Sequence, residues 1–144
     1  MIWQNSVTSF IYTLLSSDSI LVNSSITVEL NEQFNRDINK TPWVGVYGGE
    51  IAVLPHRAQI TQPWIITFEI PIYVQGASFD NGQEAADILD RTLTPVLTAI
   101  NSNRALGSTV DLIREWEITP FDRDIDDNNY FYTDELLLRA EVRG

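Results

Sequence analysis

The stretch "WIITFEIPIYVQ", residues 64–75, alternates apolar and mixed side chains more regularly than any other part of the chain. Successive side chains of an extended strand point to opposite faces of its sheet. One face would carry Trp64, Ile66, Phe68, Ile70, Ile72 and Val74, and the other Ile65, Thr67, Glu69, Pro71, Tyr73 and Gln75. At about 3.3 Å per residue, such a strand would be about 40 Å long. The stretch therefore predicts one long strand with a fully apolar face.

Pro71 and the second face of this strand point to contacts beyond the sheet. Proline lacks a backbone N–H, so it removes one hydrogen bond from the ladder and favours an edge position or a bulge. Ile65 and Tyr73 make the second face more apolar than a solvated face needs to be. We therefore predict a subunit interface that includes Ile65, Pro71 and Tyr73, on a strand at the sheet edge.

Shorter strands are predicted on both sides of this stretch. "SITVELNE" (25–32) alternates, and "NRDINKTP" (35–42) is predicted to be a polar loop. "WVGVYGGEIAVLP" (43–55) predicts a hairpin in which Gly48 and Gly49 supply positive φ at the turn. Residues 110–119 and 130–142 predict two closing strands, joined by an acidic loop.

Two segments have helical periodicity. Apolar side chains recur at i, i+4, i+7 and i+8 from Trp3 to Leu15, and "SSDS" (16–19) then predicts a turn. A second apolar stripe lies within residues 78–103, where Asp80 or Asn81 is a candidate cap and Pro95 predicts a kink or a break. The order of elements predicts a single α+β domain over residues 1–144: a mostly antiparallel sheet with an N-terminal helix and a second helix on one face.

Charge and composition exclude several classes of function. Twenty acidic against nine basic residues give a net charge of -11, and such a surface repels nucleic-acid phosphates. No apolar run approaches the roughly 18 to 20 residues that span a bilayer, and without cysteine neither disulfides nor thiolate metal sites are possible. The N-terminus lacks the basic region of a signal peptide. We expect a soluble protein made inside the cell, with no membrane partner.

No catalytic constellation is apparent in the sequence. His56 is the only histidine, it lies in a loop, and no G-x-S-x-G elbow is present. "GVYGGE" (45–50) lacks the G-K-[ST] of a phosphate loop. Glu115 and Glu117 flank Trp116 on a predicted strand, which indicates a solvated face. We predict no enzymatic activity, no catalytic residue and no cofactor.

The stretch "DIDDNNYFYTDE" (124–135) raises the question of a metal site. Asp124, Asp126, Asn128 and Glu135 occupy positions 1, 3, 5 and 12 of an EF-hand-like loop. An EF-hand needs helices on both sides, whereas the flanks here alternate as strands do. We therefore predict no metal ligands, and keep a calcium-dependent binding module as an alternative of another class.

With these elements in place, the chain resembles the tail terminator (tail completion) proteins of tailed bacteriophages. The resemblance covers most of the chain and lies in the order of elements rather than in a sharp motif. It rests on "SVTSFIYTLL", "PWVGVY", "ITQPWIITFEIPIYVQG", "NGQEAADILDRTLTPVLTAI", "LIREWEITPF" and "YFYTDELLLRAEVR".

The resemblance implies a virion protein made in the host cytoplasm and placed at the head-proximal end of the tail. It would form a homo-hexameric ring that ends polymerisation of the tail tube and joins it to the neck. The implied partners are the tail tube protein, a neck or connector protein and, in a contractile tail, the sheath protein. DNA would pass through the lumen without specific binding.

The acidic loop is the candidate contact of that ring with its lumen or the neck, through Asp122, Asp124, Asp126 and Asp127. The alternative within the same class is another head–tail connector or neck protein. A small acid/base enzyme has only the acidic composition in its favour.

Overall fold

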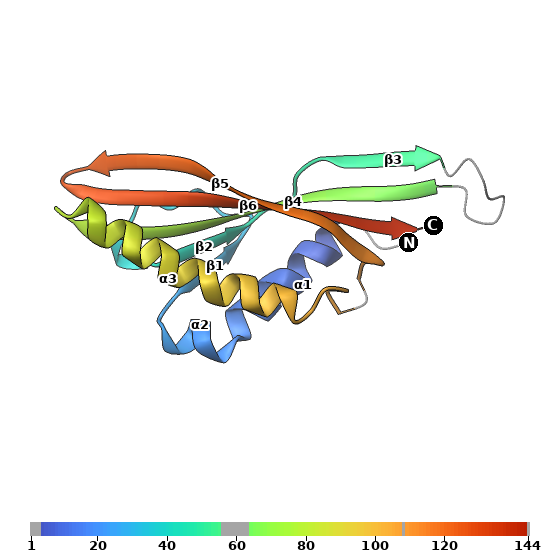
Figure 1. Cartoon of the computed structure of the whole chain (residues 1–144), viewed down its shortest axis with the longest axis horizontal. Helices are drawn as coiled ribbons and strands as arrows, with labels where there is room; N and C mark the ends of the chain where they lie inside the picture. Colours follow the sequence, from blue (N-terminus) through green and yellow to red (C-terminus); the bar gives the residue numbers. More distant parts are fainter. Residues whose placement is uncertain (1–3, 56–63, 108, 144) are drawn as a thin grey trace.

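The computed structural model describes residues 4–55, 64–107 and 109–143. It has an α+β fold in which helices cover one face of a six-stranded sheet (Figure 1). The elements are α1 (Gln4–Ser17), α2 (Ser19–Asn23), β1 (Thr27–Leu30), the 3-10 helix η1 (Ile38–Lys40), β2 (Trp43–Val46), β3 (Ile51–Pro55), β4 (Trp64–Phe79), α3 (Gly82–Asn101), β5 (Leu112–Asp126) and β6 (Asn129–Arg143). The predicted fold class, with its mostly antiparallel sheet, is confirmed.

The long strand β4 lies at the centre of the sheet. The strand order is β1-β2-β4-β6-β5, and β3 pairs with β4 as well. Only β1 and β2 run parallel. On one side β4 pairs with β6 along its whole described length, from Ile65 opposite Arg143 to Phe79 opposite Asn129. The prediction that this strand lies at an edge is therefore wrong.

Pro71 is tolerated in a central strand because its ring nitrogen faces a gap between two partners. On that side of β4, β2 ends opposite Ile72 and β3 begins opposite Phe68. The carbonyl of Pro71 accepts a hydrogen bond from the N–H of Tyr47 at 3.1 Å, in the connection between β2 and β3. Since the nitrogen and carbonyl of one strand residue face the same neighbour, the missing N–H costs no bond to β6.

The predicted hairpin around Gly48 and Gly49 is also wrong. β2 and β3 do not pair with each other but lie end to end along β4, each antiparallel to it. Neither glycine has a positive φ. The N–H of Gly49 donates to the carbonyl of Glu69 at 2.9 Å, and a Cβ on Gly49 would lie 2.7 Å from that oxygen. The glycine therefore permits a close approach to β4.

β5 and β6 form one long hairpin where an acidic loop was predicted. Its turn is only Asp127-Asn128, with φ of 49° and 64°, the positive pair that a type I′ turn requires. Asp122, Asp124 and Asp126 therefore lie on strand β5, and only Asp127 is at the tip. The acidic composition suggested a loop, but an edge strand accommodates charged side chains because one side of it faces solvent.

The geometry of this hairpin is incompatible with a calcium-binding loop. Asp124 lies opposite Phe131, whereas Glu135 lies opposite Thr119. Five residues of strand separate the two positions, which corresponds to about 15 Å. Among the described residues, no group of three or more Asp, Glu or His side chains is placed to hold a metal ion.

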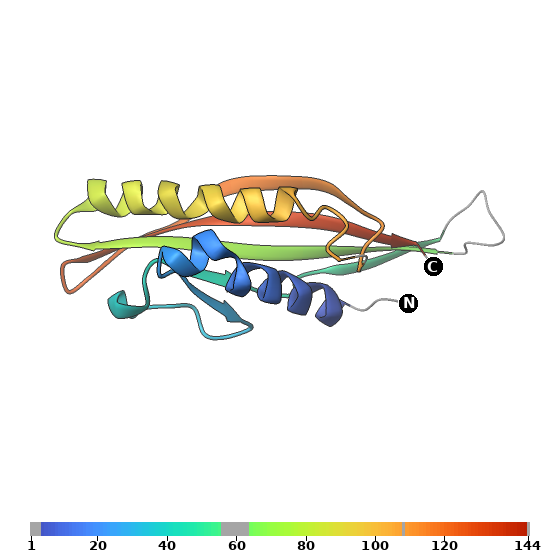
Figure 2. The ribbon, with the colours of Figure 1, turned by 90° about the horizontal axis from the view of Figure 1, so that it is seen from below.

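The helices bury their apolar stripes against one face of the sheet, and Figure 2 shows α1 (blue) and α3 (yellow) side by side in front of it. The core combines Val7, Ile11 and Leu15 of α1, Leu89, Val96 and Ile100 of α3, and Ile66, Phe68, Ile70, Ile72 and Val74 of β4. α3 begins after its cap Asn81, whose side chain accepts from the N–H of Glu84, and continues unbroken through Pro95. No described helix is long and apolar enough to cross a membrane.

The predicted interruption after α1 falls at Asp18, whose backbone is extended, and the chain then forms the short helix α2. The carboxylate of Asp18 caps it by accepting from the N–H groups of Ile20 and Leu21. α2 buries only Leu21, and leaves Ile20 and Val22 each 56% exposed.

Candidate assembly surfaces

The face of the sheet opposite the helices, here called the outer face, carries an aromatic cluster. Its members are Phe34, Trp43, Tyr47, Tyr73 and Phe121. The ring of Tyr73 lies 4.6 Å from that of Phe121, 5.5 Å from that of Tyr47 and 5.6 Å from that of Phe34. Tyr73, one of the predicted interface residues, therefore packs within its own chain.

Tyr73 also lies opposite Glu135 in the register of β4 and β6. Burial, followed by a hydrogen bond with Glu135 and the charge of that carboxylate, raises the pKa of Tyr73 to about 12. Burial likewise raises the pKa of Tyr47, assisted by the charges of Glu29 and Glu32. Both phenols are thus held neutral, as packing groups.

Residues 31–42, here called the strap, fold over this part of the outer face. Asn35, a residue of the strap, is buried, and its side-chain amide donates to the side-chain oxygen of Gln75 at 2.8 Å. The amide of Gln75 donates in turn to the hydroxyl of Thr133 at 3.4 Å. The sequence indicated only a polar loop here. Phe34, an aromatic residue beside that polar run, was the available signal that the segment packs on the domain.

The acidic residues predicted to face a lumen or the neck divide into two groups. A guanidinium nitrogen of Arg36, in the strap, lies 3.4 Å from a carboxylate oxygen of Asp122 and 3.0 Å from one of Asp124. Asp126 and Asp127, at the end of the hairpin, are exposed and form no ion pair with the described residues. The structure thus brings Asp122 and Asp124 together around one cation and leaves the other two in solvent.

Glu115 and Glu117 belong to an ion-pair network around Arg139. The guanidinium of Arg139 contacts Glu115, lies 3.2 Å from Glu69 and lies 3.2 Å from Glu117. Hydrogen bonds to Glu69 and then to Glu117 raise the pKa of Arg139. The arrangement is three carboxylates around one arginine. His56 lies outside the described residues.

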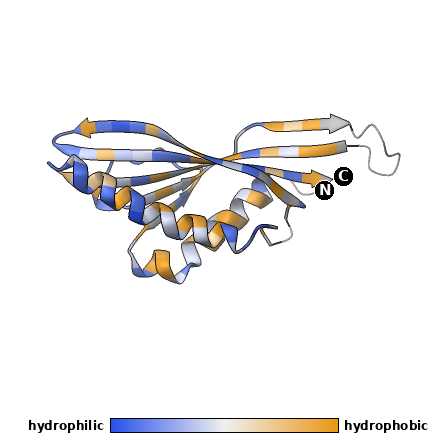
Figure 3. Cartoon of the chain, viewed as in Figure 1, coloured by the Kyte–Doolittle hydropathy of each residue, from blue (hydrophilic) through white to orange (hydrophobic). Residues whose placement is uncertain are grey.

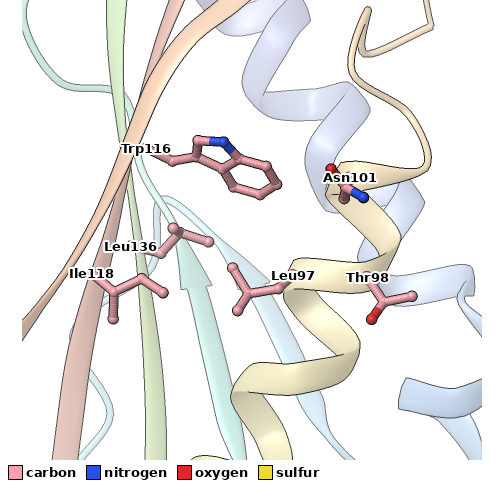
Figure 4. A pocket seen from close by; sticks show the side chains of 6 residues that line it. All are labelled: Leu97, Thr98, Asn101, Trp116, Ile118 and Leu136. Carbon is pink, nitrogen blue, oxygen red and sulfur yellow. The ribbon is translucent and has the colours of Figure 1, made fainter.

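A cleft opens on the helix side of the sheet, between α3 and β5. It has a volume of about 420 Å³ and is lined by Leu97, Thr98, Asn101, Trp116, Ile118 and Leu136. Trp116, Ile118 and Leu136 project from the strands and Leu97 from the facing helix (Figure 4). None of the six carries a charge, and Ile118 is 45% exposed.

β3 and the end of β4 paired with it (residues 64–68), here called the arm, extend beyond the helices at one end of the molecule (Figure 1). Ile51 and Val53 are 46% and 60% exposed. Ile65 is half-buried in the arm on the outer face. Ile65, Pro71 and Tyr73 therefore occupy three different surroundings on β4: the arm, the gap between β2 and β3, and the aromatic cluster.

Comparisons with known proteins give a distant structural likeness. No protein-family model matches the chain, and no curated protein matches it. Among solved structures, a chain from the virion of a native gene transfer agent (GTA) particle is similar, with 14% sequence identity and a TM-score of 0.41. The match covers 95% of this chain and 94% of that one. A likeness at this level carries no argument about function.

Proposed function

We propose that this chain is a structural virion protein that assembles into a ring at the head-proximal end of a phage tail tube. The observation that carries the proposal is the placement of large apolar side chains in solvent on an acidic chain. Eight of them are between 45% and 66% exposed: Ile20, Val22, Ile51, Val53, Phe79, Ile118, Phe121 and Ile125. Groups of exposed large apolar side chains, such as Ile51 with Val53 and Ile20 with Val22, are typical of interaction sites.

The exposed apolar side chains lie at several separate places. They belong to α2, to the arm, to the cleft, and to the end of the β5–β6 hairpin with the adjoining end of β4. A subunit of a ring stacked between two other rings needs a surface for each neighbour in its own ring and one for each adjacent ring. A closed ring is built from heterologous contacts, in which two different surfaces of each copy meet. Separate, unlike apolar surfaces suit this arrangement.

The resemblance in element order supports the finer assignment to a tail terminator. In this role, six copies would end polymerisation of the tail tube protein and bind a neck or connector protein, with a sheath protein around them if the tail contracts. The net charge of -11 suits a lumen through which DNA slides, because acidic side chains repel phosphates. The proposal assigns the chain no catalytic activity and no cofactor.

A head–tail connector or neck protein of another position is the second candidate, since the same surfaces would serve it. The two differ in what the ring touches. A terminator ring contacts the tail tube directly, whereas a connector ring contacts the portal or another neck ring.

Size-exclusion chromatography coupled to light scattering, followed by electron microscopy with tail tubes of the same virion, tests the proposal. We expect rings in solution or on the ends of tubes, and tubes of limited length when the protein is present during polymerisation. A chain that stays monomeric at high concentration and does not bind tube ends is not a tail terminator. Rings found only at the portal side would favour the connector.

A further inference from the structure

The arm exposes one edge of the strand β3. Among the described residues β3 pairs only with β4, so its other edge is free. The sequence of β3, "IAVLP", contains no charged residue. Ile51 lies opposite Phe68 and Val53 opposite Ile66, and directly paired residues share a face of the sheet. The exposed side chains therefore continue the apolar face of the core past the end of the helices.

The opposite edge of the sheet, β5, differs in each respect. Its pairing with β6 is interrupted by irregularities between Ile113 and Glu115 and between Pro120 and Asp122. Bulges, prolines and charged side chains are the usual means by which an edge strand avoids pairing with another chain. Figure 3 shows this contrast, with apolar colours along β3 and polar colours towards the turn of the β5–β6 hairpin. β5 thus carries irregularities and charged side chains that β3 lacks, and the one proline of β3, Pro55, is its last residue, so the apolar edge of β3 can accept a partner.

The cleft between α3 and β5 is the complementary feature. It is concave and open, and the exposed Ile118 and half-buried Trp116 form its apolar floor. Thr98 and Asn101 are neutral polar residues of α3 that line the same cleft. The arm is a projecting surface and the cleft is a concave one. Each copy of the chain therefore carries the two different surfaces that such a contact needs.

Charge favours a second copy of this chain as the occupant. Two copies with a net charge of -11 repel each other over most of their surfaces. A basic partner would bind most tightly to the acidic surface. Two equally acidic copies bind each other most tightly where neither surface carries charge. The strand β3 and the lining of the cleft are both free of charged residues.

We propose that the arm of one copy docks into the α3–β5 cleft of the next, with Ile51 and Val53 against Trp116 and Ile118. The contact joins two different surfaces, so it repeats from copy to copy, and it closes as a ring when the rotations between successive copies add up to a full turn. This inference rests on the proposed function, and it names the surfaces through which the ring forms.

Because the natural chain contains no cysteine, two introduced cysteines can form a disulfide across the proposed contact without competing thiols. Val53→Cys and Thr98→Cys are prepared as separate proteins, mixed, and oxidised mildly. We expect a disulfide-linked heterodimer in the mixture, identified by mass spectrometry of the joined peptides, and little homodimer in either protein alone. Thr13→Cys, mixed with each of them, is the control for random collision, because Thr13 is exposed on α1 and belongs to none of the apolar surfaces named above.

Charge substitution supplies a second, quantitative readout. Val53→Asp is expected to weaken self-association at least tenfold, which corresponds to about 1.4 kcal/mol. Thr13→Asp is the matched control, since Thr13 is also exposed, is β-branched like Val53, and lies on α1 outside the apolar surfaces named above. Circular dichroism confirms that both variants are folded.

The outcomes separate the two proposals. If the wild-type protein forms rings but Val53→Cys and Thr98→Cys do not cross-link above the control, the arm-to-cleft contact is wrong and the ring remains. Homodimers of Val53→Cys in place of the heterodimer, or equal weakening by Thr13→Asp, likewise overturn it. If the wild-type protein neither self-associates nor binds tubes, the proposed function fails, and the contact fails with it.

Discussion

The raised pKa of Tyr73 predicts how one phenol hydroxyl makes the free energy of unfolding depend on pH. The folded chain holds the phenol proton with a pKa of about 12, compared with an ordinary value of 10.0. Because the proton is bound more tightly in the folded state, this contribution to the free energy of unfolding is complete below about pH 10 and is lost as the pH rises towards 12.

We therefore expect Tyr73→Phe to flatten the pH dependence of stability between about pH 10 and 12. At neutral pH the variant loses one hydrogen bond to Glu135, which costs about 0.5 to 1.5 kcal/mol. Urea unfolding at a series of pH values measures both effects. An alkaline profile as steep as that of the wild type would contradict the assignment.

Single residues could be predicted where they follow a local rule. The alternation of residues 64–75 predicted which side chains of β4 enter the core, and Ile66, Phe68, Ile70, Ile72 and Val74 are all buried. The local rule for Pro71 was sound, since proline does remove a ladder bond. The rule led to the wrong prediction of an edge strand. The sequence does not show that β2 and β3 both pair with the same side of β4 and leave a gap at residue 71.

Between elements, Gly76 sets how closely α3 approaches β4. A Cβ on Gly76 would meet the backbone nitrogen of Leu89 and lie 2.6 Å from the carbonyl oxygen of Ala85. These atoms belong to the helix backbone and cannot rotate away, so Gly76→Ala has to displace α3. We expect it to lower the free energy of unfolding by about 2 to 3 kcal/mol, in the upper range for overpacking.

Gly48→Ala is the matched control for Gly76→Ala. Its Cβ would lie 2.6 Å from the side-chain oxygen of Gln4, the far end of a flexible side chain. We expect a smaller cost of about 1 kcal/mol, because Gln4 can change rotamer and loses only the hydrogen bonds that its amide donates to the carbonyls of Gly49 and Glu69. Urea unfolding of both variants gives the comparison, and a larger cost for Gly48→Ala would show that the α3–β4 packing is not the tighter contact.

The sequence predicted which segments are helices or strands better than it predicted which strands pair with each other. The periodicities of α1, β4 and α3 are local, and so they were found. Whether residues 43–46 and 51–55 pair with each other or with a third strand depends on β4, which follows them in the chain, so the predicted hairpin failed. The acidic stretch 122–127 has the composition of a loop. Its strand structure becomes evident only when β6 supplies the paired backbone.

For the whole molecule, the proposed charge-free contact predicts how salt changes assembly. The repulsion between copies with a net charge of -11 extends over a Debye length of about 10 Å at 0.1 M salt and about 3 Å at 1 M. Added sodium chloride removes repulsion without weakening an apolar contact, so we expect self-association to become tighter. Sedimentation equilibrium across this range measures it. Weaker association at high salt would indicate a contact built on ion pairs.

The assembly surfaces as a whole were less predictable than the fold. The sequence indicated that β4 has an apolar second face, but much of that face is covered by the strap and by Phe121 of β5. The cleft joins α3 to β5 and the arm joins β3 to β4, so each exists only in the folded chain. Exposure depends on what the rest of the chain leaves uncovered, and local patterns do not contain that information.

The central position of β6 also affects how the protein comes to be made. Its pairing with β4 joins residues that are roughly 50 to 80 positions apart in the chain, a separation typical of slowly folding topologies. During synthesis, β4 and α3 leave the ribosome well before residues 129–143 do. Until then one side of the long apolar strand has no partner, and the sheet cannot close. Folding of this domain is therefore completed only after almost all of its residues have been translated.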